Sequence, residues 1–343
     1  MADRILNVIQ VGVGGRGRPH LCAQVALPER FRVTGLVDVA PAAFQEARAI
    51  TGLTGSACFP SLAAALAGVP CDAVSVITPG HLHTPYLEEA LAAGKHVIVE
   101  KPFTCDLAEA ERVVAAAERA GLRVVVTQND KRFHPYPWIR AAIAERRYGE
   151  LGTISLVHYS ARGRPFENGD PPMHLWHQGS HQIDTLLALV GRPPRRVWGV
   201  NAIPAISAWP AAPFLSSIIE FDGPVIVTYM ATSDARAYEF HLRVECRDAA
   251  ITLHGPAPNS ADSVLRVTPH QPGEVYPRCE EMPFGRPERV GGWAEVERGL
   301  WTDFWEHVVN GVPNESSGRN NLATMRVLDA IVRSSRQGAA VTL

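Results

Sequence analysis

Residues 5–17 read Ile-Leu-Asn-Val-Ile-Gln-Val-Gly-Val-Gly-Gly-Arg-Gly, a short apolar strand that runs into the pattern Gly12-x-Gly14-x-x-Gly17. A helix-compatible segment follows at 20–26, and a second apolar strand at 31–37 ends at Asp38. Strand, glycine turn, helix and an acidic residue about twenty positions on form the fingerprint of a dinucleotide-binding Rossmann unit. This stretch therefore predicts the fold of the first half of the chain.

The same loop predicts a cofactor site. Backbone N–H groups of a glycine-rich turn at a helix amino terminus can approach a pyrophosphate, where the helix dipole favours negative charge. Asp38 is expected to accept hydrogen bonds from the adenosine ribose and to repel a 2′-phosphate, which favours NAD over NADP. The two nearby arginines, Arg16 and Arg18, favour NADP instead, because their positive charges could attract its 2′-phosphate. The expected cofactor-binding residues of this loop are Gly12, Gly14, Gly15, Arg16 and Gly17.

A second informative stretch is Val97-Ile98-Val99-Glu100-Lys101-Pro102-Phe103. Its three β-branched residues predict a buried parallel strand, and Glu100 and Lys101 follow at its carboxyl end, where open α/β sheets bind ligands. Lysine occurs only three times in the chain, at 95, 101 and 131, so arginine is the ordinary surface cation. A lysine at this strand end suggests use of its compact, titratable ammonium. Pro102 can form a cis peptide that aims the lysine.

Composition limits the function classes. The 343 residues suffice for two domains, and 46% hydrophobic with 20% charged residues is typical of a soluble globular protein. A net charge of -2 argues against nucleic acid as a partner. The six cysteines lack paired spacing, which favours reduced thiols, and no signal peptide or membrane-spanning run is evident. We therefore expect a cytoplasmic protein that binds a small molecule and no membrane.

Alternating strands and helices continue to about residue 128 and predict a doubly wound parallel α/β sheet over residues 1–128. Residues 129–343 change to strands without intervening helices, which predicts an α+β domain with a mainly antiparallel open sheet. Asp222-Gly223 is expected to form the turn of a hairpin. The proline-rich segment 256–287 is expected to be irregular. Helices are predicted to resume at 300–309 and 322–334, and the last one can pack back on the first domain.

Several motifs in order resemble the Gfo/Idh/MocA oxidoreductase family. They are the glycine pattern, Thr78-Pro79 with His83, and Ala93-Gly94-Lys95-His96-Val97 leading to Glu100-Lys101-Pro102. The resemblance extends to Arg132, to Gly149-Glu150-Leu151-Gly152 and to the ending at 334–338. It implies a dinucleotide-binding domain, then a mainly antiparallel sheet whose open face commonly forms homodimers or homotetramers.

The resemblance also implies roles for residues at the ends of the strands. Thr78, Pro79 and His83 would line the ribose and diphosphate crevice of the cofactor. Glu100 would meet the nicotinamide ribose, and Lys101 would reach both the nicotinamide and the substrate. Taken singly, Thr78-Pro79 could be only a turn and His83 only a packed residue at a helix start.

A histidine-rich segment at 173–184 enters an apolar helix that is expected to end near Gly191. His174, His177, His181 and Asp184 stand at offsets of zero, three, seven and ten, so a continuous helix would place them on one face. Family members carry D-x-G-x-H-x-x-D here, with an aspartate and a histidine as the proton-handling pair. Gly179, His181 and Asp184 match, but His177 stands where that aspartate would be. Without the carboxylate, the pKa and ring orientation of His181 must be set differently.

We consider first an NAD-dependent dehydrogenase that acts on a CH–OH group of a sugar, cyclitol or glycoside. His181 would remove the hydroxyl proton, Lys101 would stabilise the alkoxide, and His177 would relay the proton or hold a neighbouring hydroxyl. Candidate substrate-binding residues are Trp176, Arg162, Arg164 and Asp184, with Trp138 as a further aromatic wall.

Three alternatives stay open. A redox-assisted glycoside hydrolase or lyase would keep NAD tightly bound and return the hydride. A metal-dependent enzyme would use the cluster His174, His177 and His181, with Asp184 as a fourth ligand or its partner. A non-enzymatic dinucleotide sensor is the third alternative, although it would not need Lys101 and His181.

Overall fold

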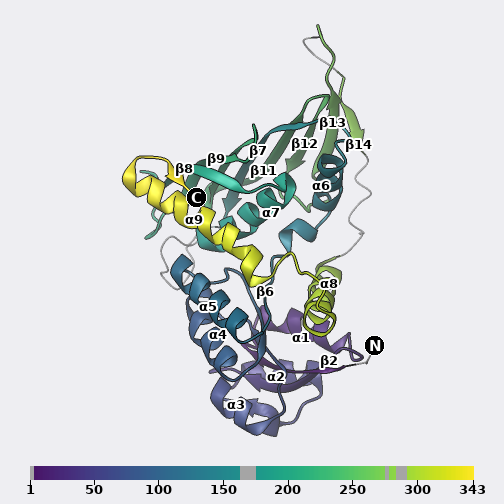
Figure 1. The fold of residues 1–343 in the computed structure, drawn as a ribbon, viewed down its shortest axis with the longest axis vertical. Helices are drawn as coiled ribbons and strands as arrows, with labels where there is room; N and C mark the ends of the chain where they lie inside the picture. The colour runs from purple at the N-terminus through teal and green to yellow at the C-terminus, as the bar shows by residue number, and fades with distance from the viewer. Residues whose placement is uncertain (1–3, 163–174, 275–277, 283–291) are drawn as a thin grey trace. The chain divides into compact units, whose positions relative to one another are not determined.

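The computed structural model describes residues 4–162, 175–274, 278–282 and 292–343 (Figure 1). The chain divides into two compact units. The first contains Met1–Asn129 and Trp293–Leu322, and the second contains Asp130–Gly292 and Ala323–Leu343. The division therefore follows Asn129 and returns a late segment of the chain to the first unit.

The first unit is built on a six-stranded parallel sheet in the order β3-β2-β1-β4-β5-β6. The order reverses between β1 and β4, which is the position where doubly wound sheets bind ligands. Short runs of β-branched and other apolar residues form these strands because both sheet faces are covered. The strands are β1 Leu6–Val11, β2 Phe31–Val37, β3 Cys58–Phe59, β4 Ala73–Val76, β5 His96–Val99 and β6 Val124–Val126.

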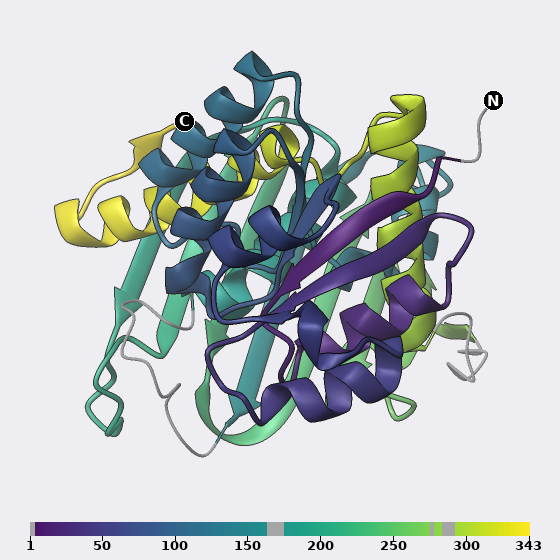
Figure 2. The same cartoon turned by 90° about the horizontal axis from the view of Figure 1, so that it is seen from below.

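Helices cover both faces of this sheet. Helix α1 contacts α2 and α8, whereas α4 contacts α3 and α5 (Figures 1 and 2). Right-handed crossovers in the two directions from β1 place these two groups on opposite faces. Asp106 caps α5 by accepting from the Glu109 N–H at 3.0 Å, as predicted. The helices are α1 Gly17–Val25, α2 Ala43–Thr51, α3 Leu62–Gly68, α4 His83–Ala92, α5 Leu107–Arg119 and α8 Trp293–Trp305.

Helix α8 completes the first hydrophobic core. Trp301 and Phe304, both 0% exposed, pack with Leu6 and Phe31 of the first two strands. The Trp301 and Phe31 rings meet edge to face with centroids 5.0 Å apart. The helix that was predicted at 300–309 begins earlier, at Trp293. Its continuation, Glu306–Asn310, is a π-helix.

The second unit contains a nine-stranded sheet in the order β14-β13-β12-β11-β7-β10-β9-β8-β15. Among the described strands only β10 and β7 pair in parallel, so the predicted mainly antiparallel sheet is confirmed. Its helices are α6 Tyr136–Ala144, α7 Ser180–Val190 and α9 Gly318–Gln337, which crosses the division after Leu322. The strands are β7 Leu151–Ala161, β8 Pro194–Ala202, β9 Phe214–Phe221, β10 Ile226–Thr232, β11 Asp234–Cys246, β12 Ala249–Gly255, β13 Val264–Pro269, β14 Glu280–Met282 and β15 Val341–Thr342.

Two details test the expected strand pattern. The hairpin of β9 and β10 is confirmed, with Asp222-Gly223 at its turn and Gly223 at φ +79°. The expectation of an irregular segment at 256–287 is wrong, because β13 and β14 lie within it and β13 pairs with β12. Within β13 proline occurs only at the last position, Pro269, so Leu265 and Val267 still reach the core.

No helix among the residues that the structure describes is long and apolar enough to cross a membrane. All six cysteines lie in the described ranges, and none forms a disulfide.

A buried polar chain connects strands β7 and β10 with α7. The Tyr229 hydroxyl donates to the Gln182 side-chain oxygen, and the Gln182 amide nitrogen contacts Nδ1 of His158. Because an amide nitrogen only donates, Nδ1 of His158 must be the acceptor. The proton of the neutral His158 ring therefore resides on Nε2. Burial lowers the pKa of His158 from 6.5 to about 4, although Gln182 opposes the shift.

We expect this histidine to make the protein sensitive to acid. As pH falls below 6.5, the unfolded chain takes up a proton at His158, whereas the folded chain does so only near pH 4. Stability is therefore lost between these values, by about 3 kcal/mol at 1.36 kcal/mol per pKa unit. His158→Asn, whose side-chain oxygen can still accept from Gln182, should flatten this acid dependence in urea unfolding curves at pH 7 and 4.5. The exposed His254→Asn is the matched control, and equal behaviour of the two variants would contradict the assignment.

Candidate functional site

The glycine loop after β1 is packed closely on one side and open on the other. Gly12 has φ +83°, and a Cβ there would lie 2.2 Å from the Ile77 carbonyl oxygen. A Cβ at Gly17 would lie 2.2 Å from the carbonyl oxygen of Gly12. At Gly14 and Gly15 an added Cβ would meet no atom within 4 Å. The loop therefore forms a tight turn that leaves backbone accessible to a ligand at Gly14 and Gly15.

Asp38, at the end of β2, is held beside this loop. Its Oδ2 accepts from the Val13 N–H at 3.0 Å, and its Oδ1 accepts from the Ala40 N–H at 2.9 Å. Each carboxylate oxygen has a second lone pair for another donor. The geometry thus fits a carboxylate that is preset to receive ribose hydroxyls.

Asp38→Ser should weaken NAD binding about 10- to 100-fold, because a hydrogen bond to a charged group contributes about 1.5–3 kcal/mol. Binding of NADP should weaken less, since the charge that repels a 2′-phosphate is removed. Calorimetric titration of the purified protein with each dinucleotide measures both effects. Glu46→Gln, which removes another carboxylate of the first unit, is the control. An unchanged NAD affinity in Asp38→Ser would refute the assignment.

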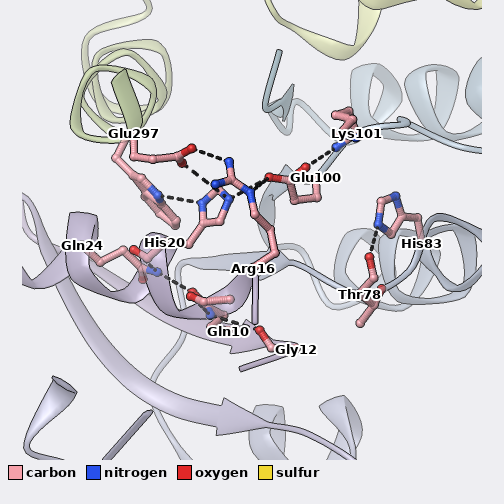
Figure 3. A network of polar contacts seen from close by, with 12 residues as sticks. Gln10, Gly12, Arg16, His20, Gln24, Thr78, His83, Glu100, Lys101 and Glu297 are labelled. Atoms are coloured by element: carbon pink, nitrogen blue, oxygen red, sulfur yellow. Dashed lines mark hydrogen bonds and ion pairs between the residues drawn. The ribbon is translucent and has the colours of Figure 1, made fainter. Parts of the chain in front are cut away.

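Arg16 of the glycine loop lies in a network of buried charges (Figure 3). Its Nε donates to Glu100 Oε1 at 2.7 Å, and its terminal nitrogen pairs with Glu297 of α8. His20 Nε2 lies 3.0 Å from the same Glu100 oxygen. The Trp301 N–H donates to His20 Nδ1 at 3.2 Å, so the proton of a neutral His20 resides on Nε2 and faces Glu100.

These contacts set the charge of Glu100. Burial alone would raise the pKa of this carboxyl, but the hydrogen bond from His20 and the positive charge of Arg16 hold it well below its usual range. Glu100 is thus an anion that fixes Arg16, and through it the glycine loop, to the end of β5. Sequence inspection missed His20, Glu297 and Trp301, because no local pattern marks their partners.

His83 lies between two of the loops at the sheet edge. Its side chain is fully buried, with Nδ1 2.8 Å from the Pro102 carbonyl oxygen and Nε2 2.8 Å from that of Thr78 (Figure 3). Burial lowers the pKa of His83, and a neutral ring can donate to only one of these carbonyls. In this arrangement the ring of His83 connects the loops that follow β4 and β5.

The carboxyl ends of β4, β5 and β6 gather polar groups. Lys101 donates its backbone N–H to Glu100 Oε2 at 3.0 Å, and the Lys101–Pro102 peptide is cis. Thr78 Oγ1 and both side-chain polar atoms of Gln128 are buried and have no hydrogen-bond partner in the described part of the chain. Polar groups of this kind cost about 1–3 kcal/mol unless they are paired. The sequence analysis did not identify Gln128, whose side-chain amide, unpaired within the described residues, lies at this edge of the sheet.

Two of the predicted polar residues, His181 and Asp184, lie in the second unit beside charged side chains. His181, 7% exposed, has its Nδ1 3.9 Å from Asp130 Oδ1. Asp184 is buried, with Oδ2 3.0 Å from Lys131 Nζ and Oδ1 accepting from Thr324 at 3.3 Å. Asp184, predicted to bind substrate, is therefore engaged in a buried ion pair.

The continuous α-helix assumed for the histidine segment is wrong, because Leu175–Gly179 form a π-helix before α7 begins at Ser180. A π turn contains more residues than an α turn, so the offsets from 177 to 184 do not define a single α-helical face. His177 belongs to this π-helix. Gly191 ends α7 in the left-handed conformation, as expected.

The other predicted residues lie as follows. Trp176 is 8% exposed, and Arg162 is exposed. The guanidinium carbon of Arg147 lies over the Trp138 ring, 5.5 Å from the ring centroid. No group of three or more metal-ligating side chains occurs in the described ranges. Arg164 and His174, and with His174 part of the metal hypothesis, lie outside the described residues.

Comparison with known proteins places the site in context. Residues 6–128 match a family model described as the Gfo/Idh/MocA oxidoreductase family with an NAD-binding Rossmann fold. UDP-N-acetylglucosamine 3-dehydrogenase of Acidithiobacillus ferrooxidans is 35% identical over 199 residues, 56% of this chain and 58% of that protein. D-apiose dehydrogenase of Paraburkholderia graminis is 26% identical over 305 residues, 82% of this chain and 75% of that protein. Several curated relatives, such as inositol 2-dehydrogenase of Streptomyces avermitilis, are matched over only about half of their length, 54% in that case.

Solved structures share the whole fold. Aldose-aldose oxidoreductase of Caulobacter crescentus superposes with a TM-score of 0.82 at 20% identity, covering 99% of this chain and 100% of that one. Levoglucosan dehydrogenase gives 0.81 at 20% identity, with 99% of each chain covered. The family match of residues 6–128 identifies this part of the chain as an NAD-binding Rossmann domain of the Gfo/Idh/MocA oxidoreductase family.

Proposed function

We propose that the protein is an NAD-dependent dehydrogenase that oxidises a secondary alcohol of a sugar, cyclitol or glycoside. The observation that carries this proposal is the carboxyl edge of the first sheet. There Lys101 follows β5, and the buried amide of Gln128 and hydroxyl of Thr78 lack protein partners within the described residues. Relatives named as dehydrogenases of inositol, D-apiose and UDP-N-acetylglucosamine support an alcohol substrate of this class.

Residues of the first unit fit the cofactor. The accessible backbone at Gly14 and Gly15 would hold the diphosphate, and Asp38 the adenosine ribose. Arg16 would act indirectly, because its guanidinium is bound to Glu100 and Glu297. Thr78, Pro79, Glu100 and Gln128 would border the nicotinamide side, supported by His83. When bound, NAD supplies the acceptor for the hydride that leaves the carbinol carbon.

The chain itself would manage the proton. The Lys101 ammonium donates a hydrogen bond to the substrate oxygen and stabilises the negative charge that develops there as the C–H bond breaks. His181 accepts the hydroxyl proton, so the alcohol becomes a ketone with loss of one hydride and one proton. His177, four positions earlier, would contact a neighbouring hydroxyl or pass the proton onward.

The test is NADH formation, followed by absorbance, with purified protein, NAD or NADP and a panel of sugars, cyclitols and glycosides, with and without chelator. Turnover with NAD that is unaffected by chelator and is lost in His181→Ala supports the proposal. Silence across the panel, with NAD retained by the purified protein, contradicts net oxidation and favours a hydrolase or lyase that recycles its cofactor. Loss of activity with chelator would favour the metal-dependent alternative.

We further propose a homodimer or homotetramer formed through the open sheet of the second unit. Gly199 faces Ile331 of α9 on the covered side, whereas the neighbouring Trp198 is 45% exposed. Trp198 pairs with Ile218, which is 44% exposed, so their side chains form an apolar patch on the uncovered side. Trp198→Glu combined with Ile218→Glu should yield monomers in light scattering after gel filtration. Val39→Glu, at an exposed apolar residue of the first unit, should not. An unchanged mass in the double variant would exclude this face.

A further inference from the structure

We infer that Asp130 is the positioning carboxylate of His181, holding the ring at Nδ1 so that Nε2 is the nitrogen that accepts the substrate proton. This inference rests on the proposed function, in which His181 is the base. Asp130 lies in the short helical turn Asp130–Arg132, and its Oδ1 is 3.9 Å from Nδ1 of His181. The His181 side chain is 9% exposed and that of Asp130 is 20% exposed, so the pair is largely shielded from water.

The separation is that of an ion pair and exceeds that of a direct hydrogen bond. Hydrogen bonds of catalytic groups often shorten when the substrate complex forms, so this geometry is compatible with the role. A base histidine works best when the nitrogen that does not react is held by a partner that fixes tautomer and orientation. A carboxylate beside Nδ1 favours the proton on that nitrogen.

The other acidic residue of this region is committed elsewhere. Asp184 receives Lys131 Nζ at 3.0 Å on one oxygen and the Thr324 hydroxyl at 3.3 Å on the other. Its charge is thus balanced by Lys131 in a buried pair. Asp130 is therefore the carboxylate whose charge His181 experiences most directly.

The surroundings strengthen this interaction. Tyr136 and Tyr229 are both buried, and the pKa of each is raised first by burial and then by the negative charge of Asp130. Two buried phenols on α6 and β10 thus lie within range of this carboxylate, in an environment where charges are weakly screened. Titratable groups on α7 and on the elements packed against it include Lys131 of the helical turn, Tyr136 of α6, His177 of the π-helix and Asp184 of α7 itself.

The arrangement gives His181 an acidic neighbour from a different part of the sequence. Position 177 holds a histidine, whose side chain is neutral or positively charged and so cannot act as an anionic partner. Asp130, 51 positions before His181, is brought near by the fold. When the ring takes up a proton, this carboxylate stabilises the imidazolium and so favours the proton transfer.

The test uses the full-length protein as wild type, Asp130→Asn, Asp130→Glu and Tyr136→Phe. Nitrogen-15 correlation spectra of the histidine rings, with His181 identified by its absence in His181→Gln, report both tautomer and titration. In wild type the neutral ring should carry its proton on Nδ1. In Asp130→Asn the ring should become a mixture of tautomers, and its titration midpoint should fall by about one pH unit or more because the imidazolium loses its anionic neighbour.

Asp130→Glu should restore much of the wild-type tautomer and midpoint. Tyr136→Phe, which changes the pocket but keeps the carboxylate, should leave both nearly unchanged. An unaltered His181 spectrum in Asp130→Asn overturns the inference, and so does a change of the same size in Tyr136→Phe.

Kinetics provide the second readout. Asp130→Asn should lower kcat about 10- to 100-fold and move the acid limb of the pH profile to lower pH, with the Kd for NAD unchanged. Equal kinetics in Asp130→Asn and wild type would contradict the role. If wild type oxidises none of the alcohols, the dehydrogenase proposal fails, while the ring spectra still decide whether Asp130 holds His181.

Discussion

Lys101→Met lowers kcat about 10²- to 10³-fold in the expected dehydrogenase reaction, with a much smaller effect on the Kd for NAD. Removal of one preorganised donor to a developing oxyanion typically has this magnitude. Methionine keeps the length and most of the apolar stem of lysine, so the variant tests the ammonium itself. Initial rates of NADH formation at saturating NAD, with a separate dinucleotide titration, measure the two quantities.

The same strand offers the matched control. Lys95 precedes β5 and Lys101 follows it, so the two lysines lie at opposite ends of His96–Val99. Ligands bind at the carboxyl edge of such a sheet, so Lys95→Met should leave kcat near that of wild type. Equal loss in both variants would mean that Lys101 acts only through stability or general charge.

Lys131→Met should lower the free energy of unfolding by about 3–5 kcal/mol, because it removes the positive charge that lies beside the buried Asp184 carboxylate. Lys131 Nζ and Asp184 Oδ2 are 3.0 Å apart, with side chains 5% and 9% exposed. The double variant Lys131→Met/Asp184→Leu removes both charges and should recover most of the lost stability. Urea unfolding followed by circular dichroism provides the comparison.

The control for this prediction is an exposed pair of the same unit. Arg333 and Asp329 lie 3.4 Å apart on α9, with side chains 51% and 30% exposed. Arg333→Met should change stability by at most about 0.5 kcal/mol, as is usual for an exposed helical pair. If Lys131→Met is equally mild, the buried carboxylate must be neutralised in another way.

The sequence predicts those features that depend on neighbours along the chain. The glycine loop, the strand that ends at Lys101 and the Asp106 cap each need only a few adjacent residues, and all three have the expected backbone form. The hairpin turn at Gly223 belongs to the same class. Local propensity, patterning and turn chemistry are enough for such elements.

Features that depend on distant partners were not predictable in this way. Arg16 and Glu297 are 281 positions apart, and nothing near either residue indicates the other. Asp130 was not considered, because its relation to His181 arises only when the chain folds. The π-helix at Leu175–Gly179 was not predicted for a different reason. Its turn is wider than an α-helical turn, and the spacing of apolar residues in this segment does not distinguish the two kinds of helix.

The position of α8 has a consequence for the order in which the protein can mature. Residues 1–129 contain every strand of the first sheet, yet Leu6 and Phe31 are covered by Trp301 and Phe304. A growing chain on the ribosome therefore exposes this apolar face until residues near 305 have emerged. The dinucleotide loop also acquires its Glu297 contact only then. A cassette meant to transplant this cofactor domain into another enzyme must include residues 293–322 together with residues 1–129.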